Sequence, residues 1–430
     1  MRKRARIEVK STAGPDILVV ADRVPDFDRA SGSLRFYQIL QILARKYRVA
    51  FLGRVDTGGQ NPRRYARALE AVGIEVRPSS EVDVADEVER VGLCVLFELF
   101  WTAEQALGRV RLRRPDLPVI VDSVDVHFLR ERRATEYAKR RRLARLRAAR
   151  TRRRELGVYA RADLVLAVTE ADRAEILREL PTAQVAVVPN IHVVHEAVPG
   201  FEARRANSIM FVGGFFHLPN VDGMLHFCRD VLPLVRKKLP DASLTIVGDR
   251  PPPEVRALAG EGIVVTGWVP QIEPYLDSHC VGIAPLRYGA GMKGKVGEAL
   301  AAGLPMVTTS IGAEGMSLEH GRTAMIADSP EAFASAVVQV CTNPDLHRQL
   351  SREGLAHVRQ RWDTAAVEQS LYAAVDSLRG VRPRRMTSRE RLGARASELY
   401  VRSGVPGKIA RVERVARWYA SRLSRIHTTR

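Results

Sequence analysis

Short apolar runs alternate with stretches of helical periodicity along most of this sequence. In residues 34–44, for example, apolar side chains recur at the spacing that places them on one face of a helix. Because predicted strands and helices alternate in this way, the pattern indicates an α/β fold built on doubly wound parallel sheets. The runs predicted to be strands in the first half are 17–21, 49–52, 74–76, 94–99, 119–122, 164–168 and 185–189.

A second series of the same kind fills the second half of the chain. Its predicted strands are 209–213, 244–248, 263–266, 281–285, 306–309 and 324–327. The helices predicted among and after them are 220–237, 271–278, 294–302, two helices within 330–361, and 365–378. Residues 190–206, which separate the two series, lose all periodicity and contain prolines and a glycine, as a linker does.

A chain of 430 residues is too long for one ordinary hydrophobic core, so we predict two domains. The first is a Rossmann-like domain over 1–195, and the second is a Rossmann-like domain over 196–363. A C-terminal helix over 364–380 and a basic helical extension over 381–430 follow. The extension carries fourteen Lys and Arg residues against three acidic ones.

The formal net charge of +19 is typical of chains that bind nucleic acid, anionic lipid or phosphorylated substrates, although high-GC codon bias also raises the arginine content. Two segments concentrate this charge, and both have apolar residues at helical spacing: 139–154, with Leu143 and Leu146, and 408–426. One interpretation is peripheral contact with anionic membrane lipids. The alternatives are a phosphorylated acceptor or a solvated arginine face for 139–154, and packing on the protein for 408–426. The arginine runs lack interleaved aromatic residues and any known nucleic-acid motif, so we expect no nucleic-acid partner.

The sequence contains no apolar run long enough to span a bilayer. The apolar run 17–21 near the N-terminus is also too short to be the core of a signal peptide. We therefore expect a cytoplasmic protein. If it contacts a membrane peripherally, we expect that membrane to be the inner face of the cell membrane.

The stretch 285–309, PLRYGAGMKGKVGEALAAGLPMVTT, follows a predicted strand and passes through a glycine-rich turn into a helix. The N-terminus of such a helix favours a phosphate group, and glycine lets the backbone approach it closely. Lys293 and Lys295 add positive charge, and Glu298 is placed to accept hydrogen bonds from sugar hydroxyls. The pattern predicts a nucleotide-sugar site, although a glycine turn of this kind also occurs in α/β proteins without any ligand.

Two features of the first half belong to the same predicted sheet edge. Gly32 precedes the helix 34–44 and so lies at a possible anion position, the plain alternative being an N-cap serine after a glycine. After the strand 119–122, the segment DSVDVHFLRERR brings together aspartates, arginines and His127. A histidine in such a cluster at a strand's carboxyl end is a candidate site residue.

Several motifs of the second half together resemble those of the retaining glycosyltransferases of family 4. They are FVGGFFHLPNVDGM, LTIVGDRPP, the shorter VVPN, and VTGWVPQIEPYLDSHCVGIAPLRYGAGMKGKVGEALAAGLPMVTTSIGAEG. The similarity covers nearly all of residues 205–330, and the first half matches more loosely through SGSLR, DSVDVHFLRERR and ADLVLAVTEADR. This resemblance implies a GT-B fold, in which two Rossmann-like domains face each other across a cleft.

The resemblance also implies the positions of the substrates. The nucleotide-sugar donor is expected on the C-terminal domain and the acceptor on the N-terminal one. Glu298 matches a glutamate that binds the ribose hydroxyls, and His127 resembles a histidine close to the reacting sugar. The positions expected to contact the donor are Gly32, Gly213, Gly214, Gly267, Trp268, Val269, Gly291 and Met292, together with the backbone of Lys293.

The sequence departs from the family pattern at two places. Ala290 stands where many members have a glutamate, and the stretch Gly-Gly-Phe-Phe-His-Leu-Pro-Asn lacks an Arg and a Lys that neutralise the diphosphate. It therefore resembles a subgroup with an HxPNxD pattern, in which we expect Lys293 or Lys295 to supply the missing charge. The residues expected to carry the reaction are His127, Lys293, Lys295 and Glu298.

The expected activity is transfer of a sugar from a UDP- or GDP-sugar to a glycan or glycolipid, in cell-surface polysaccharide assembly. Retention of configuration is implied by the family resemblance. No pair of aspartates stands in a metal-binding context, so we expect no metal and no cofactor. The alternatives are a nucleotide-sugar 2-epimerase of the same fold, a GT-B scaffold that has lost catalysis, and a basic binding protein. The identities of the sugar, the base and the acceptor stay open.

Overall fold

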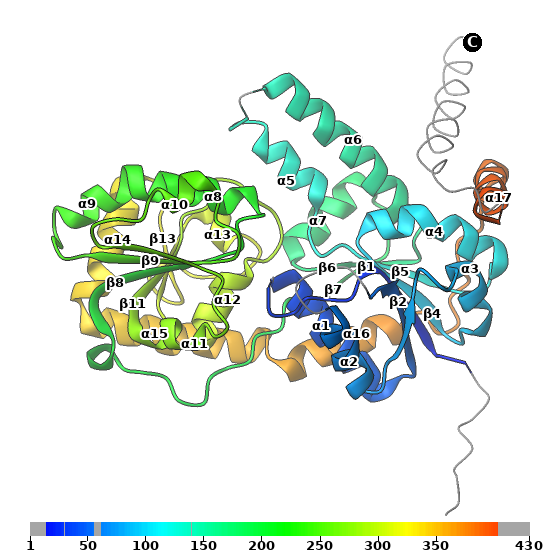
Figure 1. The fold of residues 1–430 in the computed structure, drawn as a ribbon, viewed down its shortest axis with the longest axis horizontal. Helices are drawn as coiled ribbons and strands as arrows, with labels where there is room; N and C mark the ends of the chain where they lie inside the picture. The colour runs from blue at the N-terminus through cyan, green and yellow to red at the C-terminus, as the bar shows by residue number, and fades with distance from the viewer. Residues whose placement is uncertain (1–13, 30, 56–61, 139, 403–430) are drawn as a thin grey trace, which may run out of the picture.

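The computed structural model describes residues 14–29, 31–55, 62–138 and 140–402. Its strands form two sheets, each with helices on both faces, which make up the two lobes of Figure 1. All the strand pairings in both sheets are parallel within these ranges. The predicted architecture of two Rossmann-like domains is thereby confirmed.

The N-terminal sheet has the strand order β3-β2-β1-β4-β5-β6-β7. Its strands are β1 (Ile17–Arg23), β2 (Val49–Arg54), β3 (Glu75–Pro78), β4 (Cys94–Glu98), β5 (Val119–Asp122), β6 (Leu164–Ala167) and β7 (Val185–Val187). Its helices are α1 (Ser31–Lys46), α2 (Pro62–Ala71), α3 (Val84–Glu87), α4 (Phe100–Arg113), α5 (His127–Ala134), α6 (Arg141–Tyr159) and α7 (Glu170–Glu179). The carboxyl ends of β1, β4 and β5 lead into α1, α4 and α5, so these three connections lie along one edge of the sheet.

The C-terminal sheet has the order β10-β9-β8-β11-β12-β13. Its strands are β8 (Arg205–Val212), β9 (Ser243–Val247), β10 (Ile263–Gly267), β11 (His279–Ala284), β12 (Met306–Thr308) and β13 (Met325–Ile326). Its helices are α8 (Leu218–His226), α9 (Leu232–Arg236), α10 (Pro253–Arg256), α11 (Glu273–Ser278), α12 (Gly294–Ala301), α13 (Ser310–Ala313), α14 (Pro330–Thr342) and α15 (Pro344–Arg361). The predicted sequence of strand, glycine turn, helix and strand at 281–309 is found as β11, α12 and β12.

One predicted helix of this domain is uninterrupted but is not α-helical throughout. The periodicity of 220–237 predicts a single helix, whereas the structure has α8, a π-helical segment Phe227–Val231 and then α9. Pro233 lies in the first turn of α9 and has no N–H to donate to the preceding turn. The wider π-helical turn before it accommodates this missing hydrogen bond.

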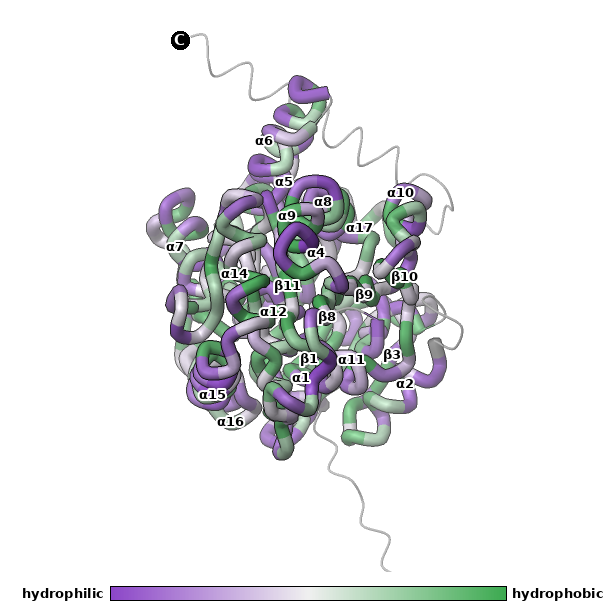
Figure 2. The backbone as a smooth tube through the Cα atoms, turned by 90° about the vertical axis from the view of Figure 1, so that its left-hand side faces the viewer, coloured by the Kyte–Doolittle hydropathy of each residue, from purple (hydrophilic) through white to green (hydrophobic). Residues whose placement is uncertain are grey.

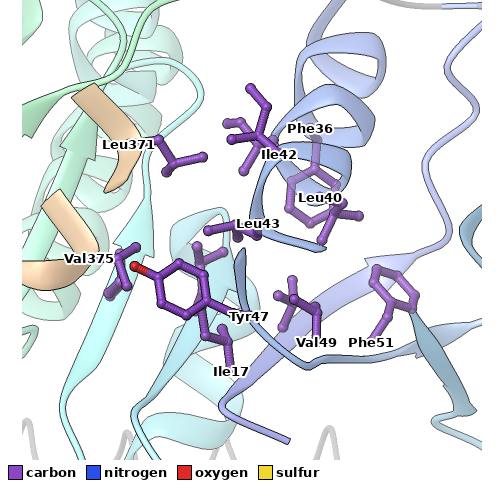
Figure 3. Close-up of a cluster of buried hydrophobic side chains, with 14 of the residues drawn as sticks. Ile17, Phe36, Leu40, Ile42, Leu43, Tyr47, Val49, Phe51, Leu371 and Val375 are labelled. Atoms are coloured by element: carbon purple, nitrogen blue, oxygen red, sulfur yellow. The ribbon is translucent and has the colours of Figure 1, made fainter. Parts of the chain in front are cut away.

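The last helix before the basic extension, α16 (Thr364–Asp376), returns to the N-terminal domain. Its residues Leu371 and Val375 belong to the same fully buried cluster as Leu40 and Leu43 of α1 (Figure 3). The hydroxyl of Tyr372 also donates a hydrogen bond of 2.8 Å to the backbone oxygen of Ile42. Burial of each such aliphatic side chain contributes about 1.5–3 kcal/mol. The chain therefore passes from the first domain to the second and back again.

Two helical features project from this body. The hairpin of α5 and α6 rises above the N-terminal domain (Figure 2), and α17 (Ser388–Arg402) packs against α4. In the part of the chain that the structure describes, no helix has both the length and the apolar character needed to cross a membrane. The predicted amphipathic helix 408–426 lies outside the described residues.

Candidate functional site

The carboxyl edges of the two sheets face each other, and the start of α1 contacts α12 across the domain boundary. The glycine turn before α12 touches the N-terminal domain directly. Gly291 has φ of +68°, and a β-carbon there would lie 3.6 Å from the β-carbon of Asp125. Any other residue would strain this backbone, and its β-carbon would lie in van der Waals contact with the N-terminal domain. Gly32 lies on the opposite wall, in the first turn of α1.

Lys295 lies in the first turn of α12 and reaches toward the end of β8. Its Nζ donates a hydrogen bond of 2.5 Å to Oδ1 of Asn220, and its Cε lies 3.1 Å from where a β-carbon of Gly213 would be. Asn220 in turn donates to the backbone oxygen of Gly214. Burial, aided by the nearby charge of Lys293, lowers the pKa of Lys295 to about 7. Lys295 therefore lies beside the glycine pair that follows β8. The stretch from Gly213 to Asn220 itself contains no Lys or Arg.

Two further residues act on the surroundings of Lys295, of which the sequence analysis had included only Arg130 in a candidate site cluster. His217 follows the glycine pair, and Arg130 comes from α5 of the other domain. Burial, with smaller effects from the positive charges of Lys295, Arg130 and Lys293, lowers the pKa of His217 to about 3. His217 is thus neutral at pH 7 and lies within a group of cations. The signal for His217 was its position in GGFFHLPN. The signal for Arg130 was its place in the cluster DSVDVHFLRERR, but nothing in the sequence linked that cluster to His217.

Asp222, two residues after Asn220, has a different role. It accepts two hydrogen bonds from the guanidinium of Arg287, one of them 2.8 Å long. Arg287 also lies 4.8 Å from the centre of the Tyr137 ring. Since Arg287 precedes the glycine turn, Asp222 fixes one end of that turn while Asn220 holds the helix that follows it.

Lys293 occupies a different environment from Lys295. Its side chain is only 5% exposed, and its Nζ donates a 2.7 Å hydrogen bond to the backbone oxygen of Gly291. Burial lowers the pKa of Lys293 to about 8, against the opposing effects of Glu314, 3.9 Å away, and of Asp172. The structure therefore places Lys293 inside the contact between the domains. Met292, before it, is half-buried at the edge of an apolar cluster of the C-terminal domain.

Ala290 has a structural explanation. It is 8% exposed and belongs to the apolar cluster of the N-terminal domain that includes Phe128 and Leu129. A glutamate at this position would place a carboxylate in that cluster, where an unpaired charge is costly. The alanine instead lets the glycine turn dock against the first domain.

Glu298 lies about one turn after Lys295 in α12 and is half-buried. Burial, with a smaller effect from the charge of Glu273, raises the pKa of its carboxyl group to about 7. Within the described residues its side chain makes no hydrogen bond, so its oxygens are available to accept one. A carboxylate in this position suits a pair of neighbouring hydroxyl groups.

The turn after β10 forms one end of the cleft. Trp268, which is 42% exposed, donates from Nε1 to the backbone oxygen of Asp28 at 3.2 Å. The guanidinium of Arg29 lies 5.5 Å from the centre of the Trp268 ring and 3.5 Å from Asp249. Gly267 before it has φ of +72°, and Val269 after it is half-buried. The indole thus links the second domain to the loop after β1.

His127 begins α5 on the opposite wall. Its Nδ1 lies 2.9 Å from the backbone oxygen of Asp125, and its ring meets the rings of Trp101 and Phe100 edge-on. Because a carbonyl oxygen only accepts hydrogen bonds, this contact places the proton on Nδ1 and leaves Nε2 as an acceptor. The carboxylate of Glu155 accepts from the backbone N–H of His127 at 3.1 Å, which holds the start of the helix.

A buried ion pair supports this wall from beneath. Arg35 of α1 donates a 2.6 Å hydrogen bond to Asp122 at the end of β5, and both side chains are about 1% exposed. A second donation of 2.8 Å goes to the backbone oxygen of Val188, after β7. The pair therefore ties α1, β5 and the end of the sheet together under Gly32.

Comparison with known proteins agrees with this arrangement. Residues 206–343 match the family described as Glycosyl transferases group 1. An uncharacterized 44.6 kDa protein in the cps region of Klebsiella pneumoniae is 26% identical over 181 residues, which are 40% of this chain and 46% of that protein. The chain thus matches about half the length of this relative.

Two solved structures share the whole two-domain arrangement. Sucrose-phosphate synthase from Thermosynechococcus elongatus has a TM-score of 0.63 at 15% identity, covering 84% of this chain and 99% of that one. HepE from Anabaena, in complex with UDP-glucose, has a TM-score of 0.58 at 12% identity with the same coverage. The chain therefore has the GT-B fold, and its residues 206–343 are similar to the Glycosyl transferases group 1 family.

Proposed function

We propose that this protein is a glycosyltransferase that moves a sugar from a nucleotide-diphosphate sugar to a glycan or glycolipid acceptor. The observation that carries the proposal is the position of Lys295 beside Gly213 and bonded to Asn220, with the charges of Lys295 and Arg130 both acting on His217. This places cations and the N-terminus of α12 at one point of the cleft. Such a group stabilises the negative charge that develops on a leaving diphosphate.

The other site residues fit the same substrate. Glu298 would accept hydrogen bonds from the ribose hydroxyls, and the turn at Trp268 would lie beside the base. A UDP-sugar is the donor class we favour, because HepE shares the fold and its structure contains UDP-glucose; a GDP-sugar is the second choice. The family 4 resemblance, with its HxPNxD subgroup, supports retention of configuration and a setting in cell-surface polysaccharide assembly.

In the proposed reaction the acceptor hydroxyl attacks from the face of the leaving diphosphate, whose oxygen takes the proton. His127, with Nε2 as an acceptor, would orient a hydroxyl of the donor sugar at the reacting carbon. Lys295 and Arg130 supply the positive charge, and we propose that no metal takes part.

The direct test is incubation of the purified protein with UDP-glucose, UDP-N-acetylglucosamine and GDP-mannose, with and without a membrane lipid extract. We expect lipid- or glycan-dependent release of nucleotide diphosphate that persists in EDTA. Interconversion of the sugar without an acceptor would instead indicate a 2-epimerase, and the absence of turnover with bound nucleotide would indicate an inactive scaffold.

We also propose that the acceptor is met at an anionic membrane surface. The helix α6 projects from the body (Figure 2). It exposes Leu143 and Leu146, at 47% and 68%, among its arginines. Exposed leucines flanked by cations suit insertion between anionic headgroups, where each basic residue contributes about 1 kcal/mol. The basic segment 408–426, outside the described residues, is proposed to act with it.

This membrane contact is testable with vesicles. Replacing Leu143 and Leu146 together by serine should reduce co-sedimentation with phosphatidylglycerol vesicles by roughly tenfold, because two apolar anchors are lost. Pure phosphatidylcholine vesicles serve as the control surface. Equal binding of both vesicle types, or no effect of the two serines, would contradict the proposal.

A further inference from the structure

Arg133, at the end of α5, crosses from the N-terminal domain to two points of the C-terminal domain. Its Nη1 donates a 2.7 Å hydrogen bond to the backbone oxygen of Gly289, in the glycine turn. Both of its terminal nitrogens also donate to the carboxylate of Glu314, with Nη2 at 2.6 Å from Oε1. One guanidinium thus holds the turn before α12 and the residue after α13 at the same time.

Glu314 is shared between two cations. Burial alone would raise the pKa of its carboxyl group, but the hydrogen bonds and charge of Arg133 outweigh this effect and lower it. Its Oε2 also lies 3.9 Å from Nζ of Lys293, whose ammonium group is bonded to Gly291. The carboxylate therefore connects Arg133 to both ends of the glycine turn, at Gly289 and at Gly291.

The tip of the same hairpin adds a second contact to this turn. Tyr137 stacks on Tyr288 with ring centres 5.2 Å apart, and its hydroxyl donates to the backbone oxygen of Arg287 at 3.2 Å. Arg133 and Tyr137 are one turn apart along the chain, so they reach the glycine turn from one side. Both contacts are lost if the two domains separate.

One rigid element connects this contact to the opposite wall of the site. α5 begins at His127 and contains Arg130 and Arg133, so these side chains lie within about 9 Å along its axis. A displacement of α5 therefore moves His127 together with Arg133, which holds the glycine turn through Gly289.

We infer that Arg133 and Glu314 are positioning residues that make the shape of the glycine turn depend on docking of α5. The inference rests on the proposed function and deepens it. When the domains are closed, the pair holds the turn so that the leaving diphosphate meets Lys295 and the N-terminus of α12. When they open, the turn loses the bonds at Gly289 and Glu314, and the nucleotide-sugar is held less accurately for reaction.

The kinetic test uses Arg133→Gln, Glu314→Gln and the double variant. We expect kcat to fall by 10- to 100-fold in each, whereas the Kd of UDP rises less than threefold, because Lys295, Glu298 and Trp268 remain. The double variant should be no worse than the single ones, since the two residues act as a pair. Arg133→Lys should recover only part of the loss, because a lysine keeps the charge without the two-pronged geometry.

The matched control is Arg132→Gln. Arg132 lies on the same helix and pairs with Glu175 of the same domain at 3.1 Å. Equal kcat values for Arg132→Gln and Arg133→Gln, or full additivity in the double variant, would overturn the inference.

A second readout separates this inference from the proposed function, because it needs no turnover. Small-angle X-ray scattering of the ligand-free protein should show a larger radius of gyration for Arg133→Gln than for Arg132→Gln, at unchanged far-UV circular dichroism. If the wild type transfers no sugar but this expansion occurs, the proposed function fails and the coupling stands. If transfer occurs and neither kcat nor the radius changes, the coupling fails alone.

Discussion

The two walls of the cleft differ in how their charged groups are satisfied. On the N-terminal wall, Arg35 pairs with Asp122, Arg130 pairs with Asp125, and Glu155 holds the start of α5. On the C-terminal wall, within the described residues, the side chains of Glu298 and His217 make no hydrogen bond, and Lys295 makes one. The charged groups of the first wall are paired with one another and form a framework, and Arg130 in addition acts on His217 of the second wall. The second keeps polar atoms available, as a wall that binds a ligand must.

The largest effect that tests this contrast is on the stability of the framework wall. Arg35→Leu should cost about 3–5 kcal/mol of unfolding free energy, because it leaves the carboxylate of Asp122 buried without its partner. Urea denaturation followed by circular dichroism measures the loss. Arg45→Leu, on the same helix, breaks an exposed pair with Glu368 and should cost less than about 1 kcal/mol. Similar losses in the two variants would contradict the framework role of the first wall.

The corresponding change on the ligand-binding wall should affect activity and leave stability largely intact. Lys295→Met keeps the length of the side chain and removes its charge, so kcat/KM for the nucleotide-sugar should fall by about 100- to 1000-fold. Lys237→Met, at an exposed position after α9, is the control. If Lys295→Met retained most of its activity, the proposed diphosphate position would be wrong.

A smaller effect comes from pH. Lys295 has its pKa lowered to about 7, so it loses its proton as the pH rises through neutrality and attracts a diphosphate less. Glu298 has its pKa raised to about 7, so it becomes protonated and a poorer acceptor as the pH falls below that value. The affinity for UDP should therefore peak near pH 7 and fall by up to about tenfold per pH unit well above it.

Calorimetric titration of UDP between pH 6 and 9 measures this profile. Lys295→Arg keeps its charge throughout this range, so its affinity should no longer decline on the alkaline side. An alkaline decline that persisted unchanged in Lys295→Arg would assign the titration to another group.

Much of the fold follows from the sequence, because strands and helices alternate with strong periodicity and the glycine turn marks the sheet edge. Lys293 and Lys295 could not be distinguished by their type or charge. They are two positions apart at the start of a helix, so they point in different directions, and only the neighbouring domain decides which one is enclosed. The segment DSVDVHFLRERR, which contains Arg130 and Arg133, was predicted as part of a site, but not which groups it contacts across the domain boundary. The partners of Arg133, Gly289 and Glu314, lie on the other domain and are far away in the sequence.

The return of α16 to the first domain also has a consequence for synthesis of the chain. Leu371 and Val375 complete the apolar cluster around α1, yet they are made after the entire second domain. Domains usually fold as they leave the ribosome, the N-terminal one first. Here the apolar cluster around α1 is complete only once residues 364–376 have been made. The second domain, continuous from 205 to 361, is therefore free to fold to completion before the first.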